Sequence, residues 1–475
     1  MKPRTLLILL VVVLGLGAFI WFYERKLPSS EERTALEKKV LAVEKDEVTA
    51  VTIESGKGGT VRLEKIEPPK PAKKEKDKKD EEAAETAAEW RMTRPFATRA
   101  DTFAVDRLLD AVAGLEKTST LENVNPKDVG LDEPRATLHL TTKKGEKVLA
   151  LGAEVPPGGS LVAGLKGEKG AYVVSDTILT DVDKAPADWR DKQLFRGDRE
   201  AIQRLTLTGG AGGGPVILVR RPAGFWIEKP LADRADRDLV DGLLSDLTGL
   251  TAERFLEGSR PLAELGLAPP RETVEVAFRG VAPPVRIELG APVTGEAAPE
   301  GQASGELTYA RVGGTVCEVR TRLAESARRA AADWRALQLS AFAVHDVESA
   351  TVQDDRTNLR LTRSGTDWKR GDTLISYLPV SDLLFAVTGA RASRLLTPQE
   401  AQAMQAGLAR PVLTFTLHTK DAGDEALLLY PPQKDGVPAR ANGRESVLLL
   451  PAETFREIQE KLRDVRTAKA VKPEK

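Results

Sequence analysis

The sequence is poor in the residues that most often carry chemistry. Its only cysteine, Cys317, excludes an intrachain disulfide, a CxxC redox pair and a thiolate metal cage. The three histidines, His139, His345 and His418, are far apart and lack HxH or HExxH spacing. We therefore predict that all four residues are structural, with Cys317 as a small apolar residue on a strand. No catalytic, cofactor-binding or metal-ligating residue is predicted, and no cofactor.

The sequence also lacks an excess of charge of either sign. Its 70 lysines and arginines nearly cancel 71 aspartates and glutamates. A nucleic-acid partner needs a basic surface, so none is predicted. The GxSxG nucleophile motif, the Walker A lysine motif and a GxGxxG loop after a strand are all missing. These absences argue against the common hydrolases and nucleotide-binding enzymes.

A long uncharged run is present at the N-terminus. Residues 5–23 read TLLILLVVVLGLGAFIWFY, with Trp21 and Tyr23 at the end where interfacial aromatics belong. At about 1.5 Å per residue, the run approaches the roughly 30 Å thickness of a bilayer core. A cleaved signal peptide has a shorter apolar core, of roughly 7–15 residues, and small residues before its cleavage site. We therefore predict an uncleaved transmembrane anchor over residues 1–28.

The orientation of this anchor stays open from the residues alone. Lys2 and Arg4 precede the run, but a similar number of basic residues follow it, and the positive-inside rule weakens before a long domain. After the anchor, the run SSEE offers Ser29 and Glu32 as a capping box. This pattern predicts a short charged stalk helix over residues 29–40.

The rest of the chain repeats itself three times. Each copy begins with alternating apolar and polar residues, typical of half-buried antiparallel strands, and continues into a strand led by Trp90, Trp226 or Trp368. A helix follows, whose apolar residues recur at i, i+3, i+4, i+7 and i+10 and whose end carries Gly114, Gly249 or Gly389. Gly-Leu-x-x-Pro comes next, at residues 130, 266 and 407. These separate motifs therefore recur in the same order and at nearly the same spacing in each copy.

The first two copies end in nearly identical runs, ADWRDKQL at 187–194 and ADWRALQL at 332–339. Asp464-Val465-Arg466 resembles a degenerate third copy of the Asp-Trp-Arg run. We predict that Trp189 and Trp334 anchor the end of each domain by packing; the alternative is that they contact a ligand.

These signals predict an α+β fold: a single N-terminal transmembrane helix followed by three tandem, homologous, β-rich domains. The expected boundaries are 41–196, 197–342 and 343–467, with a flexible tail at 468–475. The first domain carries a charged insert at 66–89, where its siblings have a hairpin tip of about four residues. Its Pro-, Ala- and Lys-rich composition predicts disorder.

An anchor ending in ERKLPSSEER at 24–33, followed by tryptophan-led strands, V-x-x-L-L helices and G-L-x-x-P elements, resembles the bacterial family called domain of unknown function 4340. The resemblance covers nearly the whole chain, apart from the charged insert. It implies a single-pass inner-membrane protein with a periplasmic soluble part, linked to gliding-motility-type ABC transporters. It implies no known catalytic residues.

Two classes of function are therefore expected. The first is a non-enzymatic accessory protein that presents its repeat domains to an envelope ABC transport or gliding-motility-type complex. The alternative is a cell-envelope module that binds glycan or lipid, and an envelope enzyme is a weaker alternative. An enzyme needs a distinctive acid, base or nucleophile in one copy, and no such departure stands out.

Overall fold

The computed structural model describes residues 37–66, 89–209, 214–256, 258, 260–294 and 306–471. The predicted anchor, most of the predicted stalk and nearly all of the charged insert lie outside these residues. Within them, no helix is long and apolar enough to cross a membrane. The chain divides into two compact units after Lys192.

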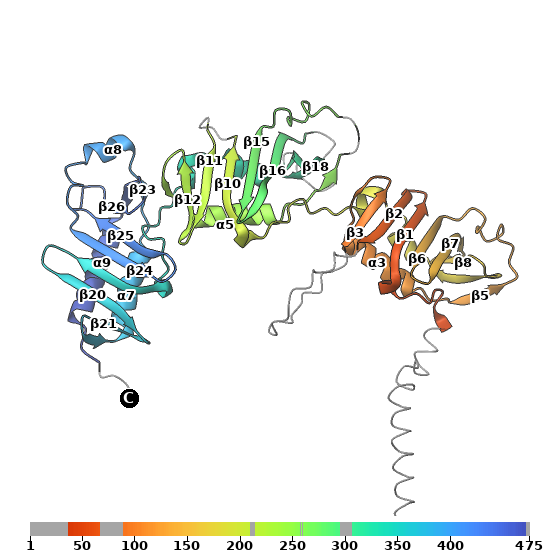
Figure 1. The fold of residues 1–475 in the computed structure, drawn as a ribbon, viewed down its shortest axis with the longest axis horizontal. Coiled ribbons are helices and arrows are strands. Elements are labelled where there is room, and N and C mark those ends of the chain that lie inside the picture. Colours follow the sequence, from red (N-terminus) through yellow and green to blue (C-terminus); the bar gives the residue numbers. More distant parts are fainter. Residues whose placement is uncertain are drawn as a thin grey trace, which may run out of the picture. The chain divides into compact units, whose positions relative to one another are not determined.

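Three nine-stranded antiparallel sheets confirm the predicted tandem β-rich repeats (Figure 1). The first unit holds one sheet, and residues 193–475 hold two. The first sheet has the order β4-β3-β2-β1-β6-β7-β8-β9-β5 and comprises β1 (Val48–Ser55), β2 (Gly59–Ile66), β3 (Glu89–Arg94), β4 (Thr98–Arg99), β5 (Ser119–Glu122), β6 (Ala136–Thr142), β7 (Gly145–Val155), β8 (Ser160–Leu165) and β9 (Gly170–Ser175).

The other two sheets have the same strand order. The second comprises β10 (Ile202–Thr208), β11 (Val216–Arg221), β12 (Gly224–Lys229), β13 (Asp233–Arg234), β14 (Arg254–Phe255), β15 (Glu272–Phe278), β16 (Val281–Pro292), β17 (Leu307–Val312) and β18 (Thr315–Arg320). The third comprises β19 (Val347–Gln353), β20 (Asn358–Ser364), β21 (Asp367–Arg370), β22 (Thr373–Ile375), β23 (Arg394–Leu395), β24 (Leu413–Thr419), β25 (Gly423–Leu429), β26 (Val437–Ala441) and β27 (Leu448–Leu450).

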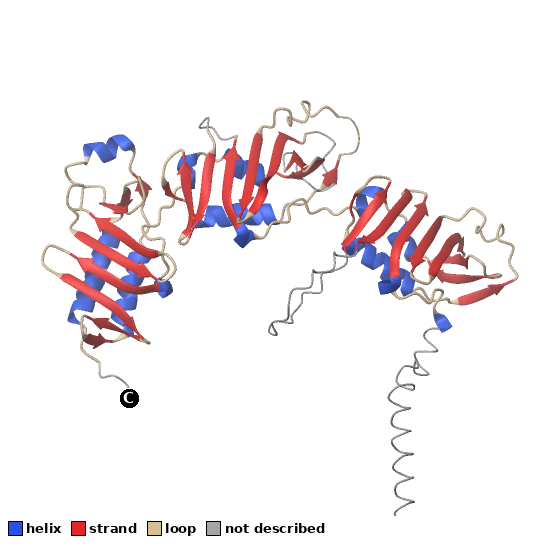
Figure 2. Cartoon of the chain, viewed as in Figure 1, coloured by secondary structure: helices blue, strands red, loops and turns tan. Residues whose placement is uncertain are grey.

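Helices cover one face of each sheet (Figure 2). A short 3-10 turn precedes the first strand of each repeat: η2 (Lys45–Glu47), η4 (Arg199–Ala201) and η6 (Val344–Asp346). The predicted helix of each repeat is α3 (Thr102–Ala113), α5 (Arg237–Thr248) and α7 (Tyr377–Thr388). The ends of the repeats add α4 (Ile178–Val182), η3 (Pro186–Trp189), α6 (Arg322–Arg328), η5 (Ala331–Trp334) and α9 (Ala452–Thr467), while α8 (Pro398–Ala403) follows β23.

The apolar stripe of the three homologous helices faces the core, as predicted. In α5, Val240, Leu243, Leu244 and Leu247 are buried against the second sheet. The matching stripes of α3 and α7 are buried in the same way. Asp236 begins α5 by accepting hydrogen bonds from the backbone N–H groups of residues 238 and 239. Periodicity therefore places each helix across its sheet, and α3 and α5 also begin with a capping aspartate.

Two glycine-containing motifs of the repeat contact each other. In the second repeat the Gly-Leu-x-x-Pro loop crosses strand β16, and the Ala291 N–H donates to the Leu265 carbonyl at 2.8 Å. A Cβ on Gly290 would lie 2.2 Å from that same carbonyl oxygen. The first repeat has the same arrangement at Gly152. In the third repeat Tyr430 stands at this position and packs beside Leu408, so the close crossing is absent there.

Candidate functional site

The duplicated run closes each of the first two repeats. Trp189 and Trp334 are fully buried in the cores of their own sheets. The Trp334 carbonyl accepts from the Asp236 N–H at 2.7 Å, and Arg335 pairs with Ala235 beside the edge strand β13. The first repeat repeats these contacts, with Trp189 bonded to Asp101 and Arg190 paired with Ala100. Both indoles therefore pack inside the core and do not reach solvent.

The end of the same run opens the following repeat. Leu194 N–H donates to the Leu250 carbonyl at 2.9 Å, at the C-terminus of α5. Leu339 N–H makes the corresponding bond to Ala390 at 2.8 Å, after α7. Asp-Trp-Arg thus ends one sheet and Gln-Leu begins the next, which explains why eight residues recur together.

The third repeat ends differently from the sequence interpretation. Asp464, Val465 and Arg466 lie inside α9, a 16-residue helix, and not in a 3-10 turn. The edge pairing is made instead by Ala470, which bridges Ile375, and by the Val471 N–H, which donates to Leu374. Residues 469–471 of the predicted tail therefore follow the edge of the third sheet.

The three histidines and the cysteine occupy four separate places. His139 on β6 and His418 on β24 each lie beside a carboxylate on the neighbouring strand, and His345 is exposed on η6. Cys317 is buried on β18, as predicted for a small apolar residue. Among the described residues no group of three or more histidine, cysteine, aspartate or glutamate side chains could hold a metal ion.

A cleft of about 750 Å³ lies at the start of the first repeat. Residues 37–42 form one wall, and the ends of β7, β8 and β9 form the other. The lining is mixed in charge, with four lysines, three glutamates and several apolar residues. It comprises Lys39, Lys117, Lys147, Lys166, Glu37, Glu146, Glu168, Val40, Leu41, Ala42, Val148, Leu165 and Tyr172. Sequence reasoning missed this site, because the lysines come from four separate segments.

The lysines of this cleft are only partly engaged. Lys147 Nζ donates to the Ala42 carbonyl at 3.0 Å, and Lys117 Nζ lies 5.4 Å from the centre of the Tyr172 ring. Tyr172 donates to Glu168 at 2.6 Å, and this bond raises the pKa of the tyrosine hydroxyl. Within the described part of the chain, no carboxylate makes an ion pair with Lys39 or Lys166. The cleft therefore offers free ammonium groups to an anion.

Residues 193–475 contain a buried cluster of charges that the sequence did not predict. Arg444, in the turn between β26 and β27, donates to Asp233 on β13 at 2.5 Å and to the Gln338 carbonyl at 2.8 Å. Arg234 lies 3.5 Å from Glu425 on β25, and Glu425 accepts from the Ser340 hydroxyl and the Ala341 N–H. All four charged side chains are almost completely excluded from solvent. The cluster joins the second repeat to the third.

Burial sets the ionisation of this cluster. Exclusion from water, reinforced by the neighbouring Arg444 charge, lowers the pKa of Arg234 to about 10. The same exclusion raises the pKa of the Glu425 carboxyl, against the opposing effects of the Ser340 hydrogen bond and the Arg234 charge. Two guanidinium groups and two carboxylates thus neutralise one another inside the protein, as buried charges require.

The raised pKa of Glu425 predicts a pH-dependent stability difference. A carboxyl whose pKa is higher in the folded chain contributes stability below its unfolded pKa of about 4.3, and that contribution is lost as pH rises through the folded pKa. Glu425→Gln cannot titrate and keeps an acceptor for Ala341. We expect the unfolding free energy of the variant, relative to wild type, to rise as the pH is raised above about 4.3 in urea titrations.

Glu400 provides a control of opposite sign. It is exposed, and its hydrogen bond from Arg394 lowers the pKa to about 2. The stability contribution of Glu400 is therefore lost only as pH falls below about 4.3. Glu400→Gln should differ from wild type by a nearly constant amount above about pH 5. A constant difference for Glu425→Gln as well would contradict the burial effect.

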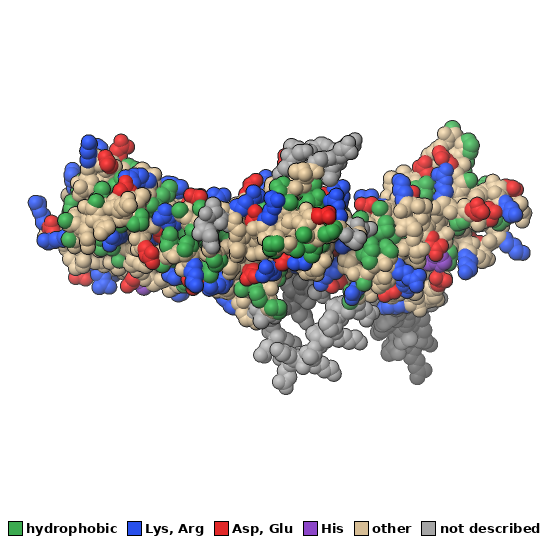
Figure 3. All heavy atoms as spheres, turned by 90° about the horizontal axis from the view of Figure 1, so that it is seen from above, with side chains coloured by type: hydrophobic (Ala, Val, Ile, Leu, Met, Phe, Trp, Pro, Cys, Tyr) green, Lys and Arg blue, Asp and Glu red, His purple; other side chains and the backbone are tan. Residues whose placement is uncertain are grey.

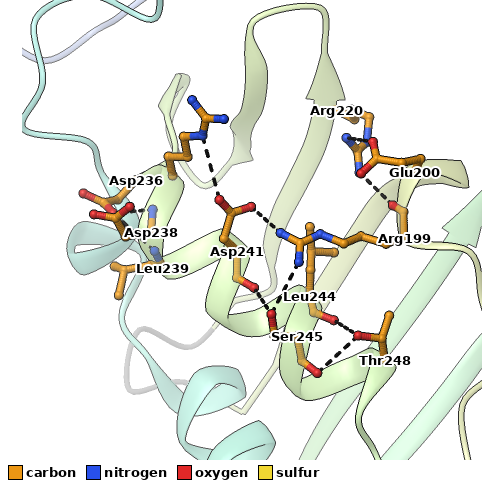
Figure 4. A network of polar contacts seen from close by, with 11 residues as sticks. Arg199, Glu200, Arg220, Asp236, Asp238, Leu239, Asp241, Leu244, Ser245 and Thr248 are labelled. Carbon is orange, nitrogen blue, oxygen red and sulfur yellow. Dashed lines mark hydrogen bonds and ion pairs between the residues drawn. The ribbon is translucent and has the colours of Figure 1, made fainter. Parts of the chain in front are cut away.

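The outward face of α5 carries an ionic network (Figure 4). Arg199 on η4 donates to Asp241 at 2.6 Å and lies 3.4 Å from the Ser245 hydroxyl. In the first repeat Lys45 on η2 makes an ion pair with Asp110 on α3, one helical turn further along than Asp241, at 3.2 Å. In both repeats the helix therefore faces water with charged residues joined to the preceding 3-10 turn.

The family model described as a domain of unknown function (DUF4340) matches this chain twice, over residues 90–226 and 226–378. The two matches together cover more than half of the chain. They meet at Trp226, so the first match runs from the tryptophan-led strand of the first repeat to that of the second. No curated protein and no solved structure matches.

Proposed function

The chain belongs to the DUF4340 family, and from this premise we propose that it is a non-enzymatic accessory protein of the bacterial cell envelope. Residues 1–28 anchor it in the inner membrane as a single span, and the three repeats lie in the periplasm. There they are presented to a membrane complex, an ABC transporter of the gliding-motility type.

The residues that recur among the copies support this proposal. The tryptophans, the apolar helix stripes and the glycines of the strand crossing are buried or close-packed. The outward side chains differ from copy to copy, and basic and acidic groups are interspersed over the face drawn in Figure 3. Repetition has therefore kept the scaffold and varied the surface, which suits an array that binds one asymmetric partner.

Co-purification tests this proposal. The full chain, extracted from its own membranes, should retain ABC transporter subunits, because the anchor confines both proteins to one membrane and raises their effective concentration. An exported form lacking residues 1–28 should fold but retain much less of the transporter. Failure of the full chain to retain any transporter subunit would refute the accessory role, as would activity of a cytoplasm-specific reporter fused after Lys475.

The cleft of the first repeat favours a second candidate function. Its free lysines beside glutamates suit a zwitterionic or anionic head group, such as that of a lipid or a charged envelope glycan. In that case Lys39→Glu together with Lys166→Glu should abolish binding of the lipid or glycan, while transporter subunits should be absent from the purified protein.

A further inference from the structure

The third repeat has an apolar surface where its siblings have an ionic one. The position of Lys45 and Arg199, one residue into the 3-10 turn, is occupied by Val344. The position of Asp110 and Ser245 on the helix is occupied by Phe385, of which 71% is exposed. Because Val344 replaces the basic residue, neither the ion pair of η2 with α3 nor that of η4 with α5 has a counterpart among the described residues of the third repeat.

The exposure extends along one side of α7. Leu378 is 65% exposed and stands where α5 has Asp238. Tyr377 and Val471 lie near the start of the helix and are also exposed. Among the described residues, six large apolar side chains are exposed. Four of them, Tyr377, Leu378, Phe385 and Val471, belong to the third repeat, and none belongs to the second. The first repeat shares one such position, Phe103 at the start of α3.

The fold itself does not require these apolar residues. The second repeat forms the same helix on the same sheet with Asp238 and Ser245 at the two positions. Exposed apolar clusters are unfavourable in water and mark surfaces that bind another molecule. We propose that the outward face of α7, formed by Leu378 and Phe385 with Tyr377 at its start, binds an amphipathic helix of a partner protein. This inference rests on the proposed function, in which the repeats are presented to a partner.

The spacing on α7 matches a helical partner. Leu378 and Phe385 are seven residues apart, so their side chains lie on one face and about 10 Å apart along the axis. This is the interval at which two packed helices meet side chain to side chain. Asp382 lies between them on the same face and is only loosely paired with Lys461, at 3.6 Å. A basic residue in the middle of the partner helix would complement it.

Two other occupants fit the surface less well. A second copy of the chain would bring the Asp382 side chains of two α7 helices together, and this repulsion between like charges disfavours it. A lipid surface attracts helices whose apolar face is bordered by basic residues. Here Asp382 pairs with its basic neighbour Lys461, and Asp367 accepts the Tyr377 N–H beside it, so these neighbours add no net positive charge.

The test uses the full chain in nanodiscs and a designed peptide. The peptide is an 18-residue amphipathic helix with leucines at heptad spacing and one central lysine, and a shuffled peptide of equal composition is the control. The wild-type chain should bind the first peptide, measured by fluorescence anisotropy. The variant carrying Leu378→Asp and Phe385→Ser takes its residues from α5, so it should fold, and its affinity should fall at least about tenfold.

Phe103→Asp is the matched control, because it places the same charge at the same helix position of the first repeat. It should bind the peptide like wild type. Equal binding by the double variant, binding of the shuffled peptide, or no binding at all would overturn the proposal. Dimers that depend on Leu378 and Phe385 would also overturn it. Binding to phosphatidylethanolamine–phosphatidylglycerol vesicles that depends on these two residues would do the same. The accessory role is tested separately, and it fails if the wild-type chain retains no transporter subunit.

Discussion

Arg444→Ala is expected to lower the unfolding free energy of residues 193–475 by about 3–5 kcal/mol. The substitution removes the partner of Asp233 and leaves a carboxylate in a site from which water is excluded. It also leaves the Ala336 carbonyl without the hydrogen bond that Arg444 donates to it. Urea denaturation followed by tryptophan fluorescence measures the change.

A surface ion pair of the same repeat provides the control. Arg410 and Asp355 are 2.9 Å apart but largely exposed. Because water screens such a pair, Arg410→Ala should change the unfolding free energy by less than about 1 kcal/mol. Similar losses for Arg410→Ala and Arg444→Ala would mean that burial of the charge cluster does not govern its energetics.

A double variant tests the cause more sharply. Asp233→Asn should destabilise the wild type, because it breaks a satisfied pair. In the Arg444→Ala background the same change should stabilise the protein, because it removes the unpaired buried charge. The effect of one substitution therefore changes sign with the state of its partner. Destabilisation by Asp233→Asn in both backgrounds would contradict this account.

The periodic parts of the fold could be predicted from the sequence. Long elements such as β1, β10 and α5 carry enough alternations or turns for their buried side to be unambiguous. The edge strand β13 has only two residues, which is too short to show a period. Its Asp233 and Arg234 therefore look like any other charged residues of the chain, and their burial depends on a turn more than 200 positions away.

The end of the third repeat was predicted wrongly from its resemblance to the other two. Asp464–Arg466 lie in a helix, and Phe455, Ile458, Leu462 and Val465 already have the spacing of an amphipathic helix. That pattern would have found α9. The exposed face of α7 was also visible in principle, because Leu378 and Phe385 interrupt the polar side that α5 keeps at the same positions.

Trp334→Ala is expected to lower the unfolding free energy of residues 193–475 by about 3–5 kcal/mol. The indole is fully buried in the core beneath the second sheet, and the Arg329 guanidinium lies 5.6 Å from the centre of its ring. Truncation leaves a cavity in this core, and the loss of stability increases with the volume of the cavity. Hydrogen exchange measured peptide by peptide should show faster exchange throughout the second repeat.

The equivalent substitution in the other unit is the control. Trp189 belongs to the separate core of residues 37–192. Trp189→Ala should therefore speed exchange in that unit and leave the peptides of residues 193–475 unchanged, while Trp334→Ala should do the reverse. Any loss of partner binding should then follow the loss of protection in the affected unit. A Trp334→Ala protein with wild-type exchange rates that no longer binds its partner would instead make the duplicated Asp-Trp-Arg run a binding site.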